Sequence, residues 1–431
     1  MIRNRRVADR LRTGALAAAA VTLVSLIVAY PSQAFGASLA GLTVWWEYVF
    51  PALLPFFILS ELLLGFGVVH AAGAFLSPAM RALFRLPGAG GWALAVSFAA
   101  GFPSGAKAAA DLRREGAVTR AEGDRLLAVS HLCSPIFLVS VVAVGFAGRP
   151  DIGLPLAAIH LVSALAAGAL LSRLPFGTEA AGAPPGDEPE RPGPADAPRG
   201  GFARSAASLA SAMADAHRKD GRPLGRLLGD AVTGSVQALL AIGGLMIVFS
   251  VLLQLLSAVG VAGALRAGIQ TAFVPLGMPA ALAEGAFAGL FEVHLGAYAL
   301  LSGGELTVWS AALVSAAVAW GGLSVHAQVG SFLAGTDLRY APFLIGRLAH
   351  AALAALVAFA LWRPLLRWFG GDAPAFAPGA AVGAAPAPTP IGDALPYLLS
   401  SLQALGVFLA ALAFLAAAVR LWRRAAPAVR R

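Results

Sequence analysis

Long apolar segments, broken by short polar or glycine-rich stretches, follow one another along most of this chain. A helix needs about 20 apolar residues to cross a bilayer. Segments near this length occupy residues 14–30, 43–66, 126–146, 152–171 and 395–419. Few of them carry a charge, so the pattern predicts a polytopic helical membrane protein.

One apolar segment, residues 90–100, is too short to cross. Backbone that is not helical is tolerated at bilayer depth only against protein or a water-filled cavity. We therefore expect a re-entrant hairpin with its tip near residues 101–105. Basic residues on both sides of it mark the same, cytoplasmic side of the membrane, namely Arg81, Arg85, Lys107, Arg113 and Arg114.

The second half of the chain repeats the order of features in the first half. Matching features lie 186 to 190 residues further along. An odd number of crossings in each copy forces the second copy to lie upside down, a common construction in secondary transporters. The predicted fold is therefore an all-α membrane protein with two inverted-topology repeats, each with three transmembrane helices and one re-entrant hairpin. The clearest matches are Ala52–Leu54 with Ala238–Leu240, Cys133–Ser134 with Leu323–Ser324, and His160 with His350.

Additional segments precede, separate and follow the two repeats. Arginines at both ends of the chain predict that both termini are cytoplasmic. Small residues at 34–37 leave open a cleaved signal peptide, although the long first run favours a signal anchor. A surface helix is expected at 202–216 within the linker. The predicted domains are an N-terminal anchor helix (1–42), the first repeat (43–174), a disordered cytoplasmic linker (175–228), the second repeat (229–365), a Pro/Ala-rich loop (366–393) and a C-terminal transmembrane helix with a basic tail (394–431).

Composition agrees with a membrane protein and excludes several other classes. The chain is 58% hydrophobic and 12% charged, against about 25% charged in soluble domains. The net charge of +9 collects at the ends and in particular loops, so it reports topology and not a nucleic-acid partner. The single cysteine, Cys133, excludes an intrachain disulfide and a multi-thiolate metal site. No nucleotide-binding fingerprint appears, and we expect no cofactor; a coupling ion is left open.

Two glycine- or proline-interrupted stretches, residues 101–107 and 291–297, carry ionisable side chains within apolar surroundings. A charge at bilayer depth costs about 2.5–3.5 kcal/mol even on the lenient scale, so such residues are functional candidates. Interruptions at matching places in two halves indicate the binding site of a transporter. Together with the interrupted helices they give the candidate substrate-binding residues, which are Pro103, Ser104, Gly105, Lys107, Ser130, His131, Ser134, Glu292, His294, Ser324, His326 and Gln328.

Four motifs resemble the YlbJ-type sporulation integral membrane proteins, which carry two nucleoside-recognition ("Gate") domains. They are residues 101–107 (GFPSGAK), Glu115-Gly116, Ser134-Pro135 and residues 320–328 (WGGLSVHAQ), and the resemblance covers roughly residues 45–365. The wider relatives are the concentrative nucleoside transporters, whose core pairs two hairpins with two unwound helices. Their second-hairpin motif has Asn where this chain has Phe291, and their first-hairpin motif is absent. In spore-formers the YlbJ-type protein is implicated in moving dipicolinic acid across the outer forespore membrane, and the resemblance implies the same here.

Dipicolinate is a planar dianion, so its binding requires positive charge, hydrogen-bond donors or exposed helix N-termini. A unit-charge pair at about 4 Å is worth about 4 kcal/mol at a dielectric of 20, and an exposed helix N-terminus about 0.3–1 kcal/mol. Lys107 is thus the first candidate to contact a carboxylate, unless it only anchors the hairpin at the interface. Glu292 is expected to pair with Lys107 or a histidine, or to couple proton movement. His160 and His350 are expected to serve packing, and Glu61 and Arg347 to extend toward the interface.

The sequence favours a secondary transporter or facilitator of a small organic anion. The first alternative is a nucleoside or heteroaromatic solute transporter, with or without a coupled ion. The second is a spore-envelope membrane scaffold, which would gain nothing from intramembrane Lys, Glu and His. An enzyme is not expected, because His-Glu-x-x-His spacing and paired intramembrane aspartates are absent. The expected partners are the solute and the lipid bilayer, with no nucleic acid; self-association is left open. The expected location is the cell membrane, or the outer forespore membrane in a spore-former.

Overall fold

The computed structural model describes residues 2–173, 202–302 and 306–369, and its regular elements in these ranges are helices. Five helical stretches there are long and apolar enough to span a membrane. The protein is therefore an integral membrane protein, as the hydropathy pattern predicted. The predicted Pro/Ala-rich loop beyond residue 369 and the C-terminal helix lie outside the described residues. The five stretches are Pro31–Gly65, Pro150–Leu171, Leu224–Ala258, Val308–Leu333 and Tyr340–Phe369.

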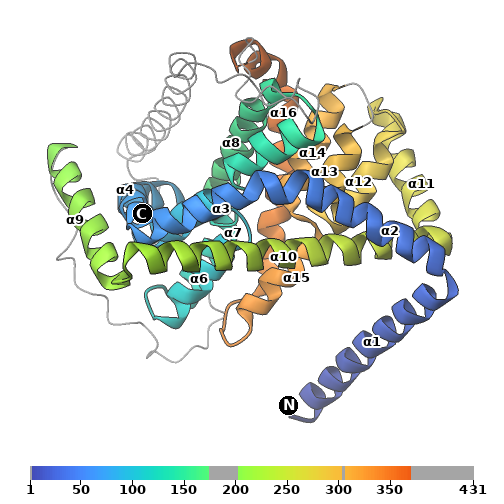
Figure 1. The fold of residues 1–431 in the computed structure, drawn as a ribbon, viewed down its shortest axis with the longest axis horizontal. Coiled ribbons are helices and arrows are strands. Elements are labelled where there is room, and N and C mark those ends of the chain that lie inside the picture. The colour runs from blue at the N-terminus through green and yellow to red at the C-terminus, as the bar shows by residue number, and fades with distance from the viewer. Residues whose placement is uncertain (1, 174–201, 303–305, 370–431) are drawn as a thin grey trace, which may run out of the picture.

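The helices of the first half follow a fixed order: a long helix, a short helix, a hairpin, an interrupted helix and another long helix. The N-terminal helix α1 precedes them and stands apart from the rest at one end of the molecule (Figure 1). The elements are α1 (Ile2–Ala29), α2 (Pro31–Val44) running through a π-helical turn (Trp45–Val49) into α3 (Phe50–Gly65), α4 (Val68–Ala79) with a π-helical end (Met80–Phe84), α5 (Gly90–Ala100), α6 (Ser104–Arg114), α7 (Arg120–Val129), a π-helical segment (Phe137–Phe146), a 3-10 turn (Pro150–Ile152) and α8 (Gly153–Leu171).

The same order recurs in the second half, after helix α9. Helix α10 crosses the whole width of the molecule and packs along α2 and α3 (Figure 1). Helices α12 and α13 form the hairpin that corresponds to α5 and α6, and α14 and α15 form the interrupted helix. The elements are α9 (Phe202–Asp220), α10 (Leu224–Ala258), α11 (Val261–Phe273) with a 3-10 turn (Val274–Leu276), α12 (Leu282–Phe291), α13 (Val293–Leu301), α14 (Val308–Trp320), α15 (Gly322–Leu333) and α16 (Tyr340–Phe369).

The interruptions lie where local chemistry prevents a regular helix. Gly101 ends α5 with a φ of +74°, and Gly321 and Gly322 separate α14 from α15 with φ of +88° and +76°. These left-handed conformations are strained for any residue with a Cβ. Residues 130–134 are not helical, and Pro135, which has no N–H to donate, follows them. A capping box starts α7, since Glu122 N donates to Thr119 Oγ1 and Thr119 N to Glu122 Oε2.

The prediction that residues 175–228 are disordered is wrong for the part that the structure describes, from residue 202 onward, which is mostly helical. Helix α9 extends the expected surface helix to Asp220, and α10 begins at Leu224. Helix α9 is held on α3 and α4, where His217 Nδ1 lies 2.9 Å from the carbonyl oxygen of Gly65. Leu227 of α10 is buried at the same place. Tertiary packing therefore orders a segment whose composition is typical of linkers.

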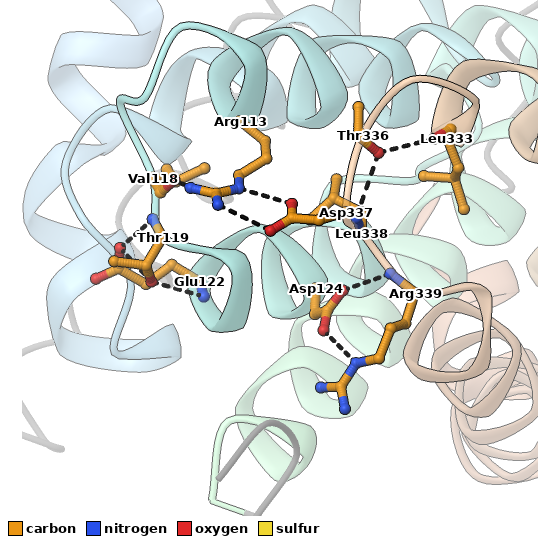
Figure 2. A network of polar contacts seen from close by, with 10 residues as sticks. All are labelled: Arg113, Val118, Thr119, Glu122, Asp124, Leu333, Thr336, Asp337, Leu338 and Arg339. Carbon is orange, nitrogen blue, oxygen red and sulfur yellow. Dashed lines mark hydrogen bonds and ion pairs between the residues drawn. The ribbon is translucent and has the colours of Figure 1, made fainter. Parts of the chain in front are cut away.

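Ion pairs join the two halves at the turn between α6 and α7. Asp124, fully buried on α7, accepts hydrogen bonds from Arg339 N (2.8 Å) and Nε (2.7 Å). Both oxygens of Asp337 accept from Arg113 at 2.8 Å. Figure 2 shows both pairs bridging to the segment between α15 and α16. The Arg113 guanidinium lowers the pKa of Asp337 below its ordinary value, so this pair is fully charged at neutral pH.

Replacing Arg339 by alanine is expected to destabilise the protein more than replacing Asp337. Arg339→Ala leaves the buried Asp124 carboxylate with one backbone donor, which costs about 1–3 kcal/mol. Asp337 is half exposed, so Asp337→Ala should cost about 1 kcal/mol or less. Thermal unfolding of the purified chain in detergent measures both, with Asp151→Ala, in the exposed Arg149 pair, as control. If Arg339→Ala lowers the unfolding temperature no more than Asp151→Ala does, the ion pairs do not hold the two halves together.

Candidate functional site

A pocket forms where the two hairpin tips and the two interrupted helices meet. It contains about 490 Å³ of empty space, counting the part open to solvent, and most of it is too narrow for the centre of a water molecule. The pocket is therefore narrow in this conformation. Every element predicted to surround a solute contributes to it. Its lining residues are Ala100, Gly101 and Phe102 at the first tip, Glu292 and His294 at the second, Cys133, Ser134 and Phe137 in the first interrupted helix, Ser324, Val325 and Gln328 in the second, and Leu53, Phe57, Ile242 and Leu245 from α3 and α10.

Glu292 is the acidic group of this pocket, and its side chain is 2% exposed. It caps the start of α13, where its Oε2 accepts from Leu295 N at 2.8 Å. Its Oε1 lies 2.7 Å from His294 Nδ1, so the imidazole N–H donates to the carboxylate. The His294 ring also meets the Phe137 ring edge-on at 5.1 Å. Of the partners considered for Glu292, the structure provides a histidine and not Lys107.

Three polar side chains from the interrupted helices complete the lining. Ser134 directly precedes the helical segment that begins at Pro135, and its Oγ accepts from Phe137 N at 3.4 Å. Gln328 Nε2 donates to the carbonyl of Ser324 at 3.3 Å. Ser324 is 1% exposed, and its hydroxyl has no hydrogen-bond partner among the described residues. A buried polar group without a partner costs about 1–3 kcal/mol, so this hydroxyl is available to a bound solute.

Four helical segments begin within a few residues of the pocket lining: α6, the segment from Phe137, α13 and α15. Helix N-termini carry partial positive charge and free N–H groups, which favour anions. One carbonyl near the end of α5 and one near the end of α12 are bonded elsewhere, with Ala99 O accepting from Ser60 Oγ at 2.9 Å and Leu290 O from Trp320 Nε1 at 3.0 Å. The helix N-termini thus contribute positive potential around the pocket, except where Glu292 caps α13.

The other candidate residues of the first half lie behind the pocket or beside it. Ser130 Oγ donates to Gly105 O at 3.2 Å and fixes the hairpin against the interrupted helix. His131 stacks on Phe102 at 5.6 Å, and both of its ring nitrogens are buried with no hydrogen-bond partner among the described residues. Pro103 precedes α6, and its peptide bond to Phe102 is cis.

Lys107, the first candidate for a carboxylate contact, does not line this pocket. Its side chain is 60% exposed and pairs with Asp111, with Nζ 2.9 Å from Oδ2. Together with Ser104 it borders a separate cavity between α3, α5 and α6. The physical reason is helical rotation, because Lys107 shares with Ser104, Asp111 and Arg114 the less buried face of α6. The placement agrees with the alternative, a lysine that follows the hairpin without entering the site.

Three further histidines have structural partners, and one arginine lies far from where the sequence suggested. His326 Nδ1 lies 2.6 Å from the Tyr340 hydroxyl and its Nε2 3.1 Å from Trp320 O. The rings of His160 and His350 pack at 4.7 Å, as expected for packing residues. Arg347 is 2% exposed on α16, so the expectation that it extends to the interface is wrong. The sequence feature that could have indicated a buried Arg347 is its position three residues before His350 in an apolar helix.

Comparison with known proteins gives one family profile and one curated relative of high similarity. The profile described as "Nucleoside recognition" (Gate) matches residues 46–150. The chain is 38% identical over 357 residues to the "Sporulation integral membrane protein YlbJ" of Bacillus subtilis (strain 168), covering 83% of this chain and 84% of the relative. No solved structure matches the chain significantly.

Proposed function

Because the chain belongs to the family of the sporulation integral membrane protein YlbJ, we propose that it is a secondary transporter or facilitator that carries a small organic anion through the pocket between its halves. One observation carries the proposal: both hairpin tips and both interrupted helices line a single pocket. A scaffold protein has no need of a buried carboxylate, an imidazole and an unpaired hydroxyl at one place.

An anion is the solute class that the electrostatics of the pocket favour. Helix N-termini, the Ser134 and Ser324 hydroxyls and the Gln328 amide are donors or sources of positive potential. Glu292 opposes an anion, but its carboxylate is already engaged by His294 and by Leu295 N. The rings of Phe102 and Phe137 offer apolar surface to a flat solute. A planar aromatic dicarboxylate matches these donors and this apolar surface, and we propose that the solute is dipicolinate. In a host that sporulates, it would be moved across the outer forespore membrane.

The topology of the proposed transporter is two inverted repeats with re-entrant hairpins, at residues 43–174 and 229–365, with both termini cytoplasmic. The recurring order of elements in the two halves supports it. So does the length of α5 and α12, with 11 and 10 residues, since each reaches about half of the 30 Å hydrocarbon core. Arg113 and Arg114 near the first hairpin support a cytoplasmic location for the α6–α7 turn.

A nucleoside or other heteroaromatic solute is the second candidate. The description of the matching family profile favours it. The buried Glu292 at a hairpin tip also suits a hydroxyl-rich neutral solute, because a carboxylate accepts hydrogen bonds from hydroxyl groups.

Flux in proteoliposomes tests these alternatives directly. Full-length protein is reconstituted, and uptake of dipicolinate, uridine and succinate is compared with empty liposomes. Saturable dipicolinate flux that exceeds both other solutes is the expected result. Saturable uridine flux alone would support the nucleoside alternative. No flux of any of them would contradict transport and favour a scaffold.

A further inference from the structure

Arg347 lies one layer behind the pocket, where interrupted helices from both halves end. Its Nη1 donates to His131 O at 2.6 Å and to Ala319 O at 3.3 Å, and its Nη2 donates to Ala128 O at 2.6 Å. The first half therefore contributes two carbonyls at the end of α7, and the second half contributes one at the end of α14. A single side chain from α16 joins both interruptions.

No carboxylate of the described residues neutralises the charge of Arg347. Among the described residues no Asp or Glu lies within ion-pair distance of it, and its Nε has no hydrogen-bond partner there. It contacts two uncharged or aromatic side chains, the Phe343 ring, whose centroid lies 5.7 Å from the guanidinium carbon, and His350, whose Nδ1 lies 3.2 Å from Nη1. Helix C-termini are partly negative and stabilise a cation. The net positive charge nevertheless remains, inside a membrane protein where such a charge is costly.

We propose that Arg347 is a positioning residue for anion transport, which ties the ends of α7 and α14 together and gives the adjacent pocket its preference for dianions. The inference rests on the proposed function. The inference goes beyond the proposed function, since it assigns a role to a residue that does not line the pocket. The bond from Arg347 to His131 O fixes the backbone next to the pocket residues Cys133 and Ser134. The bond to Ala319 O fixes the end of α14, from which the chain continues to Ser324. The guanidinium holds these carbonyls through two nitrogens, Nη1 and Nη2, in a rigid planar fork, whereas a lysine ammonium donates from a single nitrogen.

The test compares Arg347→Gln with the wild type in binding three related probes by purified full-length protein. The probes are dipicolinate (a dianion), picolinate (a monoanion) and picolinamide (uncharged). Arg347→Gln is expected to weaken dipicolinate binding by about tenfold, picolinate by about threefold and picolinamide by less than twofold. Arg149→Gln, in an exposed pair, is the control and should change none of them. If Arg347→Gln weakens the binding of all three probes equally, or of none, then the charge of Arg347 does not set the preference for dianions. A wild-type protein that binds no anion would overturn the proposed function, and this inference with it.

Arg347→Lys tests the positioning assignment separately, and it keeps the charge if Arg347→Gln fails to fold. Lysine lacks the rigid fork and carries its donors on one nitrogen, so it should hold the three carbonyls less firmly, and the ends of α7 and α14 should loosen. Labelling of the nearby Cys133 by N-ethylmaleimide should then become at least about fivefold faster, while the preference for dipicolinate over picolinamide is retained. Unchanged labelling in Arg347→Lys would show that the guanidinium does not hold the interrupted helices. Loss of the preference would show that its charge does not set the selectivity.

Discussion

Replacing Glu292 by alanine is expected to reduce dipicolinate flux by at least about tenfold while the protein still inserts. The substitution removes the cap of α13, typically worth about 1 kcal/mol. It also leaves His294 Nδ1 and Leu295 N without their acceptor, and an unpaired buried polar group costs about 1–3 kcal/mol. The second hairpin tip should therefore shift away from the geometry in which it lines the pocket. Flux per molecule in proteoliposomes, at matched protein content, measures the effect.

Two substitutions control for this result. Glu284→Ala removes an exposed glutamate from the same hairpin, and Lys107→Ala removes a lysine that lies outside the pocket. Each should keep flux within about threefold of the wild type. Glu292→Gln should be intermediate, since its amide oxygen can still accept from Leu295 N. Flux of Glu292→Ala equal to that of Glu284→Ala would remove Glu292 from the site.

Replacing Gly105 by alanine is expected to prevent stable folding of the first half. A Cβ at Gly105 would lie 1.8 Å from the carbonyl oxygen of Ser130 and 2.6 Å from Ser97 Cβ. Ordinary overpacking costs about 1–3 kcal/mol, and here a backbone carbonyl must move, so we expect a loss above about 3 kcal/mol. The fraction of monodisperse protein in detergent and its thermal unfolding temperature measure the loss.

The second hairpin offers the same test, and α15 offers a control. A Cβ at Gly296 would lie 2.2 Å from the Gly289 Cα, so Gly296→Ala should be comparably damaging. Gly330→Ala should be neutral or stabilising by up to about 1 kcal/mol, because nothing lies within 4 Å of its Cβ position and alanine favours the helix. If Gly105→Ala is as stable as Gly330→Ala, then α6 does not pack against Ser130 as closely as in this structure.

The interruptions of the helices could be predicted from the sequence because their causes are local. Glycine, proline and an ionisable residue within an apolar run are visible without any knowledge of packing. The expected apolar segment at 90–100 is α5, with the same bounds. The capping box at Thr119 likewise depends on residues three apart. The pocket residues Ser134, Glu292, His294, Ser324 and Gln328 followed from these signals.

The residues that the sequence misplaced depend on tertiary contacts. Lys107 is three residues from the first tip, but the rotation of α6 turns it outward. Arg347 is distant in sequence from the carbonyls that it binds, separated from Ala128 by 219 residues. No local pattern shows that two helix ends converge on one arginine. The surface helix expected at 202–216 is α9, but its composition did not predict its order, which comes from contacts with α3 and α4.

Protection of Cys133 by solute is the most direct test of whether the pocket between the halves is the transport site. Cys133 is the single cysteine of the chain and lines the pocket. Its labelling by N-ethylmaleimide is followed by mass spectrometry on wild-type protein in proteoliposomes. We predict slow labelling as the pocket opens during transport, and labelling slowed several-fold by dipicolinate at the concentrations that saturate flux. Labelling that saturating dipicolinate does not change, or a thiol that never reacts while flux proceeds, would contradict the account.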